Sequence, residues 1–108
     1  MKTILTAAPK ALADPGDYNA RADPMWAGML AHNNLCGVGR RQDWASHQIE
    51  HELSALYDCA HGAGLAVVTP AWMTYVMDRD IPRFAQFAVR VFGCEMDFRQ
   101  PENTARAG

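Results

Sequence analysis

Apolar residues recur three and four positions apart along most of this chain, and this spacing is typical of one face of an α-helix. Glycine and proline interrupt the pattern and divide it into successive helical segments. No stretch alternates apolar and polar residues in the way a half-buried strand does. The pattern therefore predicts an all-α fold, a multi-helix bundle without strands.

Two helices are expected in the first 40 residues. The first covers residues 3–13 and stops at a proline-glycine turn. The second begins either at Asp23, as a cap in front of Pro24, or near Asp17 with a bend at Pro24. Both starts fit the sequence.

The third helix is expected to run from Asp43, as its cap, to about Tyr57, and its two sides differ. Its apolar side is expected to be buried and holds Ile49, Leu53 and Leu56. Its opposite side holds five polar residues: His47, Glu50, His51, Ser54 and Asp58. A solvent-facing side usually carries lysine and glutamate, so two histidines without a lysine are unusual.

More helices are expected in the second half of the chain. After a glycine-rich break, residues 65–77 are expected to form a buried apolar helix that is disturbed locally at Pro70. Asp80 starts a further helix, which Gly93 closes, and a short last helix follows. The aromatic side chains are expected in the core: Trp26, Trp44, Trp72, Phe84, Phe87 and Phe92.

The composition fits one soluble globular domain. The 108 residues are 49% hydrophobic and 20% charged, with a net charge of -2, which excludes a disordered chain and argues against nucleic-acid binding. The longest apolar stretch, residues 62–77, is shorter than the roughly 20 residues that a bilayer requires, so no membrane span is expected. Three cysteines without a CxxC pair predict reduced thiols in the cytoplasm.

Three of the four histidines lie close together in the sequence. His47 and His51 are one helical turn apart, so both imidazoles can point at a common centre. His61 follows just past the expected end of the helix, where the glycines let the backbone turn. Imidazole is a good ligand for zinc and ferrous iron, so the pattern predicts a divalent-metal site. The other interpretation is that these histidines are ordinary polar surface positions.

A rival metal site uses some of the same residues. His47, Glu50 and His51 satisfy the pattern H-x-x-E-H of the inverted zinc proteases, in which both histidines bind zinc and the glutamate activates water. Such a site needs a third protein ligand, and three carboxylates are candidates by position alone: Glu95, Asp97 and Glu102. A zinc hydrolase is therefore an alternative function.

The wider sequence context favours another function. The run from Asp43 to Pro70, with His47 and His61 fourteen residues apart and a His-Gly step at its second histidine, resembles the C-terminal helical domain of the iron-containing (group III) alcohol dehydrogenases, in their butanol dehydrogenase branch. The resemblance extends upstream to Met25-Trp26-Ala27 and downstream to residues 71–73 and 84–92. It covers nearly the whole chain.

The resemblance implies a role for each residue of the histidine cluster. His47 and His61 match the two metal ligands that the family places in this domain. His51 matches a catalytic histidine that stands beside the metal, near the nicotinamide and the substrate, without binding the metal. Glu50 would support the site and would not act as a base. The family reaction is reversible hydride transfer between NAD(P)H and a small alcohol or aldehyde, assisted by Fe2+ or Zn2+.

The chain also departs from the family pattern. It contains no α/β nucleotide-binding domain, and Gly37-Val38-Gly39 lacks the context of a dinucleotide fingerprint. No aspartate has a histidine four residues later, so the family's other ligand pair is not found. We therefore expect residues 1–108 to be a single partial helical metal-binding domain from within such an enzyme, inactive alone and unable to bind NAD(P)H by itself. A homo-oligomer is expected, and a non-catalytic, self-assembling helical remnant is a further alternative.

Overall fold

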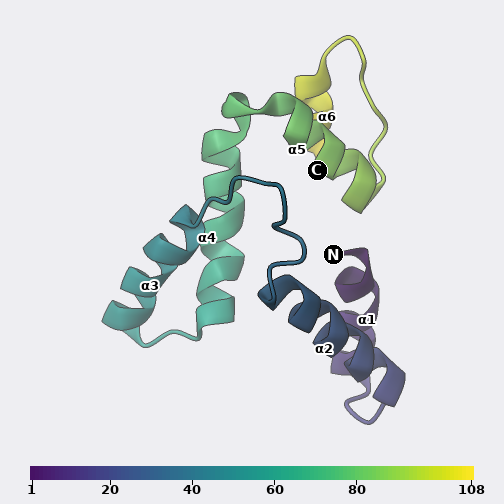
Figure 1. The fold of residues 1–108 in the computed structure, drawn as a ribbon, viewed down its shortest axis with the longest axis vertical. Helices are drawn as coiled ribbons and strands as arrows, with labels where there is room; N and C mark the ends of the chain where they lie inside the picture. The colour runs from purple at the N-terminus through teal and green to yellow at the C-terminus, as the bar shows by residue number, and fades with distance from the viewer. The chain divides into compact units, whose positions relative to one another are not determined.

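The computed structural model describes all residues from 1 to 108, and it is entirely helical (Figure 1). No strand is present, and the predicted all-α fold is confirmed. Six α-helices, one 3-10 turn and one π-helical turn follow one another along the chain: α1 Lys2–Ala13, α2 Tyr18–His32, α3 Ala45–Tyr57, α4 His61–Val76, η1 Met77–Arg79, α5 Ile81–Phe87, η2 Ala88–Phe92 and α6 Pro101–Ala107. No helix is long and apolar enough to cross a membrane.

The chain divides into two compact units, residues 1–42 and 43–108. In the first unit, α1 packs against α2. The side chain of Asp17 accepts a hydrogen bond from the backbone N–H of Ala20, which caps α2 and leaves Pro24 inside the helix. The helix therefore begins near Asp17, and the alternative start at Asp23 is wrong. The Asp17 side chain satisfies one of the N–H groups that a helix start leaves free, and the helix continues through Pro24.

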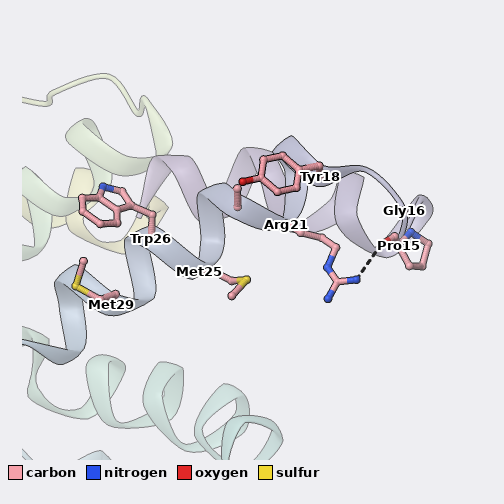
Figure 2. A pocket seen from close by; sticks show the side chains of 8 residues that line it. Pro15, Gly16, Tyr18, Arg21, Met25, Trp26 and Met29 are labelled. Atoms are coloured by element: carbon pink, nitrogen blue, oxygen red, sulfur yellow. Dashed lines mark hydrogen bonds between the residues drawn. The ribbon is translucent and has the colours of Figure 1, made fainter.

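The first unit also carries a surface hollow of about 730 Å³ (Figure 2). Its lining is mostly apolar and includes Met25, Trp26 and Met29. The guanidinium of Arg21 donates a hydrogen bond to the carbonyl oxygen of Pro15 at one end of the hollow. No histidine, cysteine or carboxylate lines it.

In the second unit, α3 and α4 form a helical hairpin. Asp43 joins the two helices near the start of α3, because one carboxylate oxygen accepts from the N–H of Ala45 at 2.9 Å and the other from Trp72 Nε1 at 2.8 Å. The predicted cap is one residue too early: Trp44 is the N-cap of α3 and makes no side-chain cap hydrogen bond, although Asp43 accepts from the N–H of Ala45, the first residue of the helix.

The remainder of the second unit is built from α5, η2 and α6. Asp80 caps α5 by accepting from the N–H of Arg83, and Gly93 ends η2 with a positive φ of 74°, as the sequence predicts. The sequence does not predict the widening of the helix into a π-helical turn over residues 88–92. A small core around Met77, Ala85 and Ala105 holds these elements together.

Burial differs from the prediction on α3 and α4. The expected apolar back of α3 is largely exposed, with Leu56 at 73%, and α4 exposes Val67 and Tyr75. Trp26, Trp44 and Phe92 are exposed as well, although the sequence analysis placed them in the core. The reason is that α3 turns its polar side towards α4, so within this chain the polar residues lie between the helices and several apolar ones do not.

Candidate metal centre

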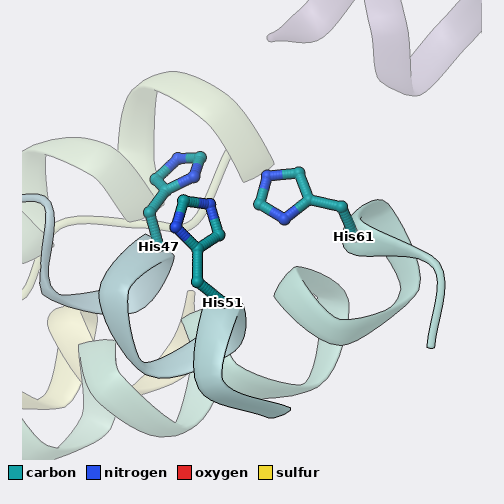
Figure 3. Close-up of side chains that lie close together, drawn as sticks. All are labelled: His47, His51 and His61. Atoms are coloured by element: carbon teal, nitrogen blue, oxygen red, sulfur yellow. The ribbon is translucent and has the colours of Figure 1, made fainter. Parts of the chain in front are cut away.

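The three clustered histidines of α3 and α4 come together on one side of the helical hairpin (Figure 3). His47 and His51 project from neighbouring turns of α3, and His61 is the first residue of α4. The ring centroid of His61 lies 5.3 Å from that of His47 and 5.1 Å from that of His51. Each residue offers one ligand nitrogen, and these atoms all lie within 4.8 Å of one another. The structure therefore brings together the three histidines that the sequence singled out.

His61 occupies a different local position from the one predicted. The sequence predicts a break between helices at this position, but α4 begins at His61 and includes Gly62 and Gly64 in its first turn. Neither glycine has a positive φ, and the N–H of Gly64 donates to the carbonyl oxygen of Ala60 at 3.0 Å, so both take part in a regular helical turn. Starting the helix at His61 fixes the backbone that carries the imidazole.

Glu50 lies beneath the histidines and is the largest fully buried side chain in the molecule, with an exposed fraction of 0%. One carboxylate oxygen is hydrogen bonded to Nδ1 of His61, and the other accepts from the hydroxyl of Ser54. The Ser54 hydroxyl oxygen also lies 3.0 Å from the carbonyl oxygen of Cys59. The sequence groups Glu50 with the polar residues of α3, and the structure encloses it away from solvent. The residue is enclosed because α4 packs over it.

Gly64 makes this enclosure possible. A Cβ atom at this position would lie 2.5–3.0 Å from three side-chain atoms of Glu50, closer than carbon atoms ordinarily approach one another or oxygen. A Cβ at Gly62 would meet nothing within 4 Å. Only the second glycine of the His-Gly-Ala-Gly sequence is therefore needed for α4 to cover the carboxylate.

The carboxyl group of Glu50 is held in its ionised form. The hydrogen bond from Ser54 lowers its pKa most, burial acts in the opposite direction, and the hydrogen bond and charge of His61 and the charge of His51 lower it further. The net result is a pKa below the ordinary value of a glutamate. An anionic carboxylate under the histidines is therefore a stable part of the site.

The donor set fits a divalent transition metal. Imidazole nitrogens suit zinc and ferrous iron better than magnesium or calcium, which prefer oxygen ligands. His47 is half-buried, while His51 and His61 are exposed, so a metal ion has access from solvent. Since the Nδ1 atom of His61 is hydrogen bonded to Glu50, its Nε2 atom is the nitrogen that stays available.

The H-x-x-E-H interpretation does not fit this geometry. In that site the glutamate faces the metal and activates water, but both oxygens of Glu50 are buried and hydrogen bonded. None of the three candidate carboxylates joins the histidine cluster: Glu95, Asp97 and Glu102. Asp97 accepts hydrogen bonds near the start of α6, and Glu102 pairs with Arg106.

Two further residues of the site, Ser54 and Gly64, have little or no sequence signal that reveals their role. Ser54 appears as one more polar residue on α3, and Gly64 as a helix breaker. Trp44 lies beside the cluster, with its ring centroid 5.2 Å from that of His47. A glycine three residues after His61 is the only sequence feature that indicates a close approach of two helices.

The fold and the site together define a class of protein, an all-helical domain with three clustered imidazoles that could hold a divalent metal. Residues 1–107 match the Fe-containing alcohol dehydrogenase family, C-terminal. The chain belongs to this family, and it corresponds to part of the C-terminal helical domain.

Individual relatives agree with this assignment. NADH-dependent butanol dehydrogenase B of Clostridium acetobutylicum is 47% identical over 88 residues, which are 81% of this chain and 23% of that protein. The NADPH-dependent aldehyde reductase YqhD of Escherichia coli is 41% identical over 90 residues, 83% of this chain and 23% of that protein. The crystal structure of E. coli K-12 YqhD matches with a TM-score of 0.87 and 35% identity over 98% of this chain and 28% of that chain. The chain thus spans about a quarter of the length of these relatives.

Proposed function

We propose that this chain supplies half of the metal site of an NAD(P)H-dependent alcohol dehydrogenase or aldehyde reductase. The proposal rests on one observation above all, the meeting of His47, His51 and His61 over a buried carboxylate in a domain of this family. The relatives act with NADH in one case and NADPH in another, so the cofactor is given as NAD(P)H. The substrate class is a small alcohol or aldehyde.

His47 and His61 hold the metal in this proposal. When bound, Fe2+ or Zn2+ supplies a Lewis acid that polarises the carbonyl oxygen of the substrate and stabilises the alkoxide. The two imidazoles come from different helices, so the packing of α3 on α4 sets the distance between them. Their positions fix where the reacting oxygen binds.

His51 is the proposed catalytic residue. It is exposed, and its ring centroid lies 6.2 Å from that of His47 and 5.1 Å from that of His61, so it stands beside both proposed ligands. A substrate oxygen that binds beside His47 and His61 lies within reach of this imidazole. His51 is then in a position to give a proton to the developing alkoxide.

The chain alone is proposed to be inactive. Its 108 residues contain no dinucleotide fingerprint and no Asp-x-x-x-His pair. The purified chain is expected to show no NADH- or NADPH-dependent reduction of butanal. Turnover that depends on His61 would overturn this part of the proposal.

The metal half-site is tested by titrating the purified chain with Zn2+ in a calorimeter. Removing a residue that only supports a metal ligand lowers metal affinity about 10- to 100-fold. Removing a ligand itself, as in His47→Ala or His61→Ala, should lower the Zn2+ affinity at least as much. His32→Ala is the matched control, because His32 is exposed on α2 and outside the cluster. Equal affinity in wild type and His61→Ala would contradict the proposed ligand set.

The enzymatic role is tested by exchange into a longer relative. The 88-residue segment of the C. acetobutylicum butanol dehydrogenase B that matches this chain is replaced by the corresponding residues of this chain. The chimera is expected to reduce butanal with NADH, to lose this activity with His61→Ala and to keep it with His32→Ala. A folded, metal-loaded chimera without activity would contradict the proposal.

Two finer points complete the proposal. Large apolar side chains are exposed on both units, which supports self-association into a homo-oligomer, and sedimentation measurements test it. The three cysteines are free thiols, which supports a cytoplasmic site of action.

A further inference from the structure

We propose that Glu50 is a positioning residue that holds His61 in its Nδ1–H tautomer and so makes Nε2 the metal-binding nitrogen. The inference rests on the proposed function, because it concerns the same site. It gives the supporting role of Glu50 a contacting atom, Nδ1 of His61, and a tautomer. Glu50, Ser54 and Gly64 are referred to below as the carboxylate cradle.

The first argument is the cost of burying the carboxylate. A buried, ionised carboxylate is unfavourable unless hydrogen bonds replace the water that it loses. Glu50 is fully buried, and its two oxygens have two different partners, the Ser54 hydroxyl and His61 Nδ1. Because the carboxylate can only accept hydrogen bonds, the imidazole nitrogen that faces it must carry the proton.

The second argument is the orientation of the ring. In a neutral imidazole only one nitrogen carries a proton, so a protonated Nδ1 leaves the lone pair on Nε2. Figure 3 shows the His61 ring pointing towards His47 and His51. The hydrogen bond to Glu50 thus selects the nitrogen and, by fixing the plane of the ring, the direction in which its lone pair points. Carboxylates that hold metal-binding histidines in this way also increase the basicity of the ligand.

The third argument is that the surrounding structure fits this role. Ser54 is one turn after Glu50 on α3 and holds the oxygen that His61 does not use. Gly64 is one turn after His61 on α4 and leaves the space that the carboxylate fills. The cradle therefore connects the two helices at the point where His61 begins α4.

A purely structural link between α3 and α4 is the competing explanation, and the tautomer separates the two. We expect long-range nitrogen–proton correlation NMR of the metal-free chain, at a pH where the ring is neutral, to show His61 with its proton on Nδ1. A His61→Ala spectrum assigns the signal. A proton on Nε2 in the wild-type chain would overturn the proposal without any variant.

The second measurement is Zn2+ affinity by calorimetry, with circular dichroism as the control for folding. Glu50→Gln keeps the shape of the side chain but offers the ring a donor as well as an acceptor. It is expected to give mixed tautomers and to weaken binding about 10- to 100-fold. Glu52→Gln is the matched control, because Glu52 is exposed on the same helix, and it should bind as the wild type does.

A folded Glu50→Gln chain with wild-type affinity would overturn the positioning role. If that chain does not fold, Ser54→Ala takes its place, with a smaller loss of affinity and a weaker Nδ1–H preference expected. An unchanged tautomer and affinity in a folded Ser54→Ala chain would then contradict the proposal.

These outcomes separate the inference from the proposed function. If His61→Ala weakens Zn2+ binding but Glu50→Gln does not, only the positioning role fails. If His61→Ala leaves binding unchanged while the wild-type ring carries its proton on Nδ1, the ligand assignment fails and the hydrogen bond is structural.

Discussion

Two glycines in the first turn of α4 have different surroundings, and they allow a direct test of the carboxylate cradle. Gly64 faces the side chain of Glu50, whereas Gly62 faces open space. Neither has a positive φ, so alanine is sterically acceptable to the backbone at both positions. Any difference between the two alanine variants must come from packing.

We expect Gly64→Ala to lower the free energy of unfolding by about 1–3 kcal/mol, since its Cβ overlaps a buried side chain that has no space to move into. Gly62→Ala is expected to raise it by up to about 1 kcal/mol, because alanine favours the helix over glycine. Urea denaturation followed by circular dichroism measures both. Equal effects at the two positions would mean that α4 does not cover Glu50 as described.

At the level of single residues, the sequence could predict the histidines but not their support. His47, His51 and His61 stand out because histidine is rare in this chain and because their spacing fits a common centre. The burial of Glu50 could not be predicted, since an acidic residue on a polar helix face normally faces water. It becomes buried only through contacts with Ser54 and Gly64, which depend on how two helices pack.

Among the elements, α6 is tied to the preceding loop by one buried hydroxyl. Thr104 is 2% exposed, and its Oγ1 accepts from the N–H of Asp97 at 2.7 Å and donates to the carbonyl oxygen of Glu95 at 3.1 Å. Both loop groups lose their partner if the hydroxyl is removed.

Thr104→Val keeps the shape of the side chain and is expected to lower the free energy of unfolding by about 1–3 kcal/mol. Thr104→Ser, which keeps the hydroxyl and loses a methyl group, should cost about 1 kcal/mol or less. Chemical denaturation of both variants measures the difference. A serine variant as unstable as the valine variant would show that the methyl group, and not the hydroxyl, matters.

The stability of the same region is expected to depend on pH through the carboxyl group of Asp97. The backbone N–H of Gln100, the side chain of Asn103 and the backbone N–H of Arg99 donate to its carboxylate and lower its pKa below the ordinary value of 3.8, against the effect of burial. A carboxyl group whose pKa is lower in the folded state than in the unfolded state stabilises the fold at pH values above its unfolded-state pKa. This contribution is lost as the pH falls towards the folded-state value.

The unfolding free energies of the wild-type and Asp97→Asn chains should therefore differ most above pH 3.8 and converge as the pH falls below it. Urea titrations at a series of pH values measure this difference. A difference that stays constant down to the lowest pH at which the chain folds would contradict the assignment.

Most of the helices could be predicted from the sequence, and the errors in their predicted bounds share a cause. Proline and glycine usually interrupt helices, so the sequence allows a start at Asp23 and predicts the helix that begins at His61 only from residue 65. The structure accommodates Pro24 inside α2 and two glycines in the first turn of α4. The intrinsic helix preference of a residue is a weak guide where a cap or the packing of a neighbouring helix determines the backbone conformation. The π-helical turn of residues 88–92 has no signal in the sequence either.

For the molecule as a whole, every group of the candidate metal centre lies in the second unit. The three histidines and the carboxylate cradle all fall within residues 43–108. A chain consisting of those residues is expected to fold as helices and to bind Zn2+ as tightly as residues 1–108 do. Calorimetry on the shortened chain tests this, with residues 1–42 as the control that should not bind. Loss of affinity in a folded 43–108 chain would show that the first unit takes part in the site.

The close approach of Gly64 to Glu50 also restricts how related proteins can vary. A side chain at position 64 and a buried glutamate at position 50 exclude one another, because both would occupy the same volume. Where evolution has replaced the glutamate by a small residue, position 64 is free to carry a Cβ atom, and where the glutamate is kept, glycine must be kept with it. The two positions should therefore covary among family members, and the lineages that keep the pair should be those that orient this histidine through a carboxylate.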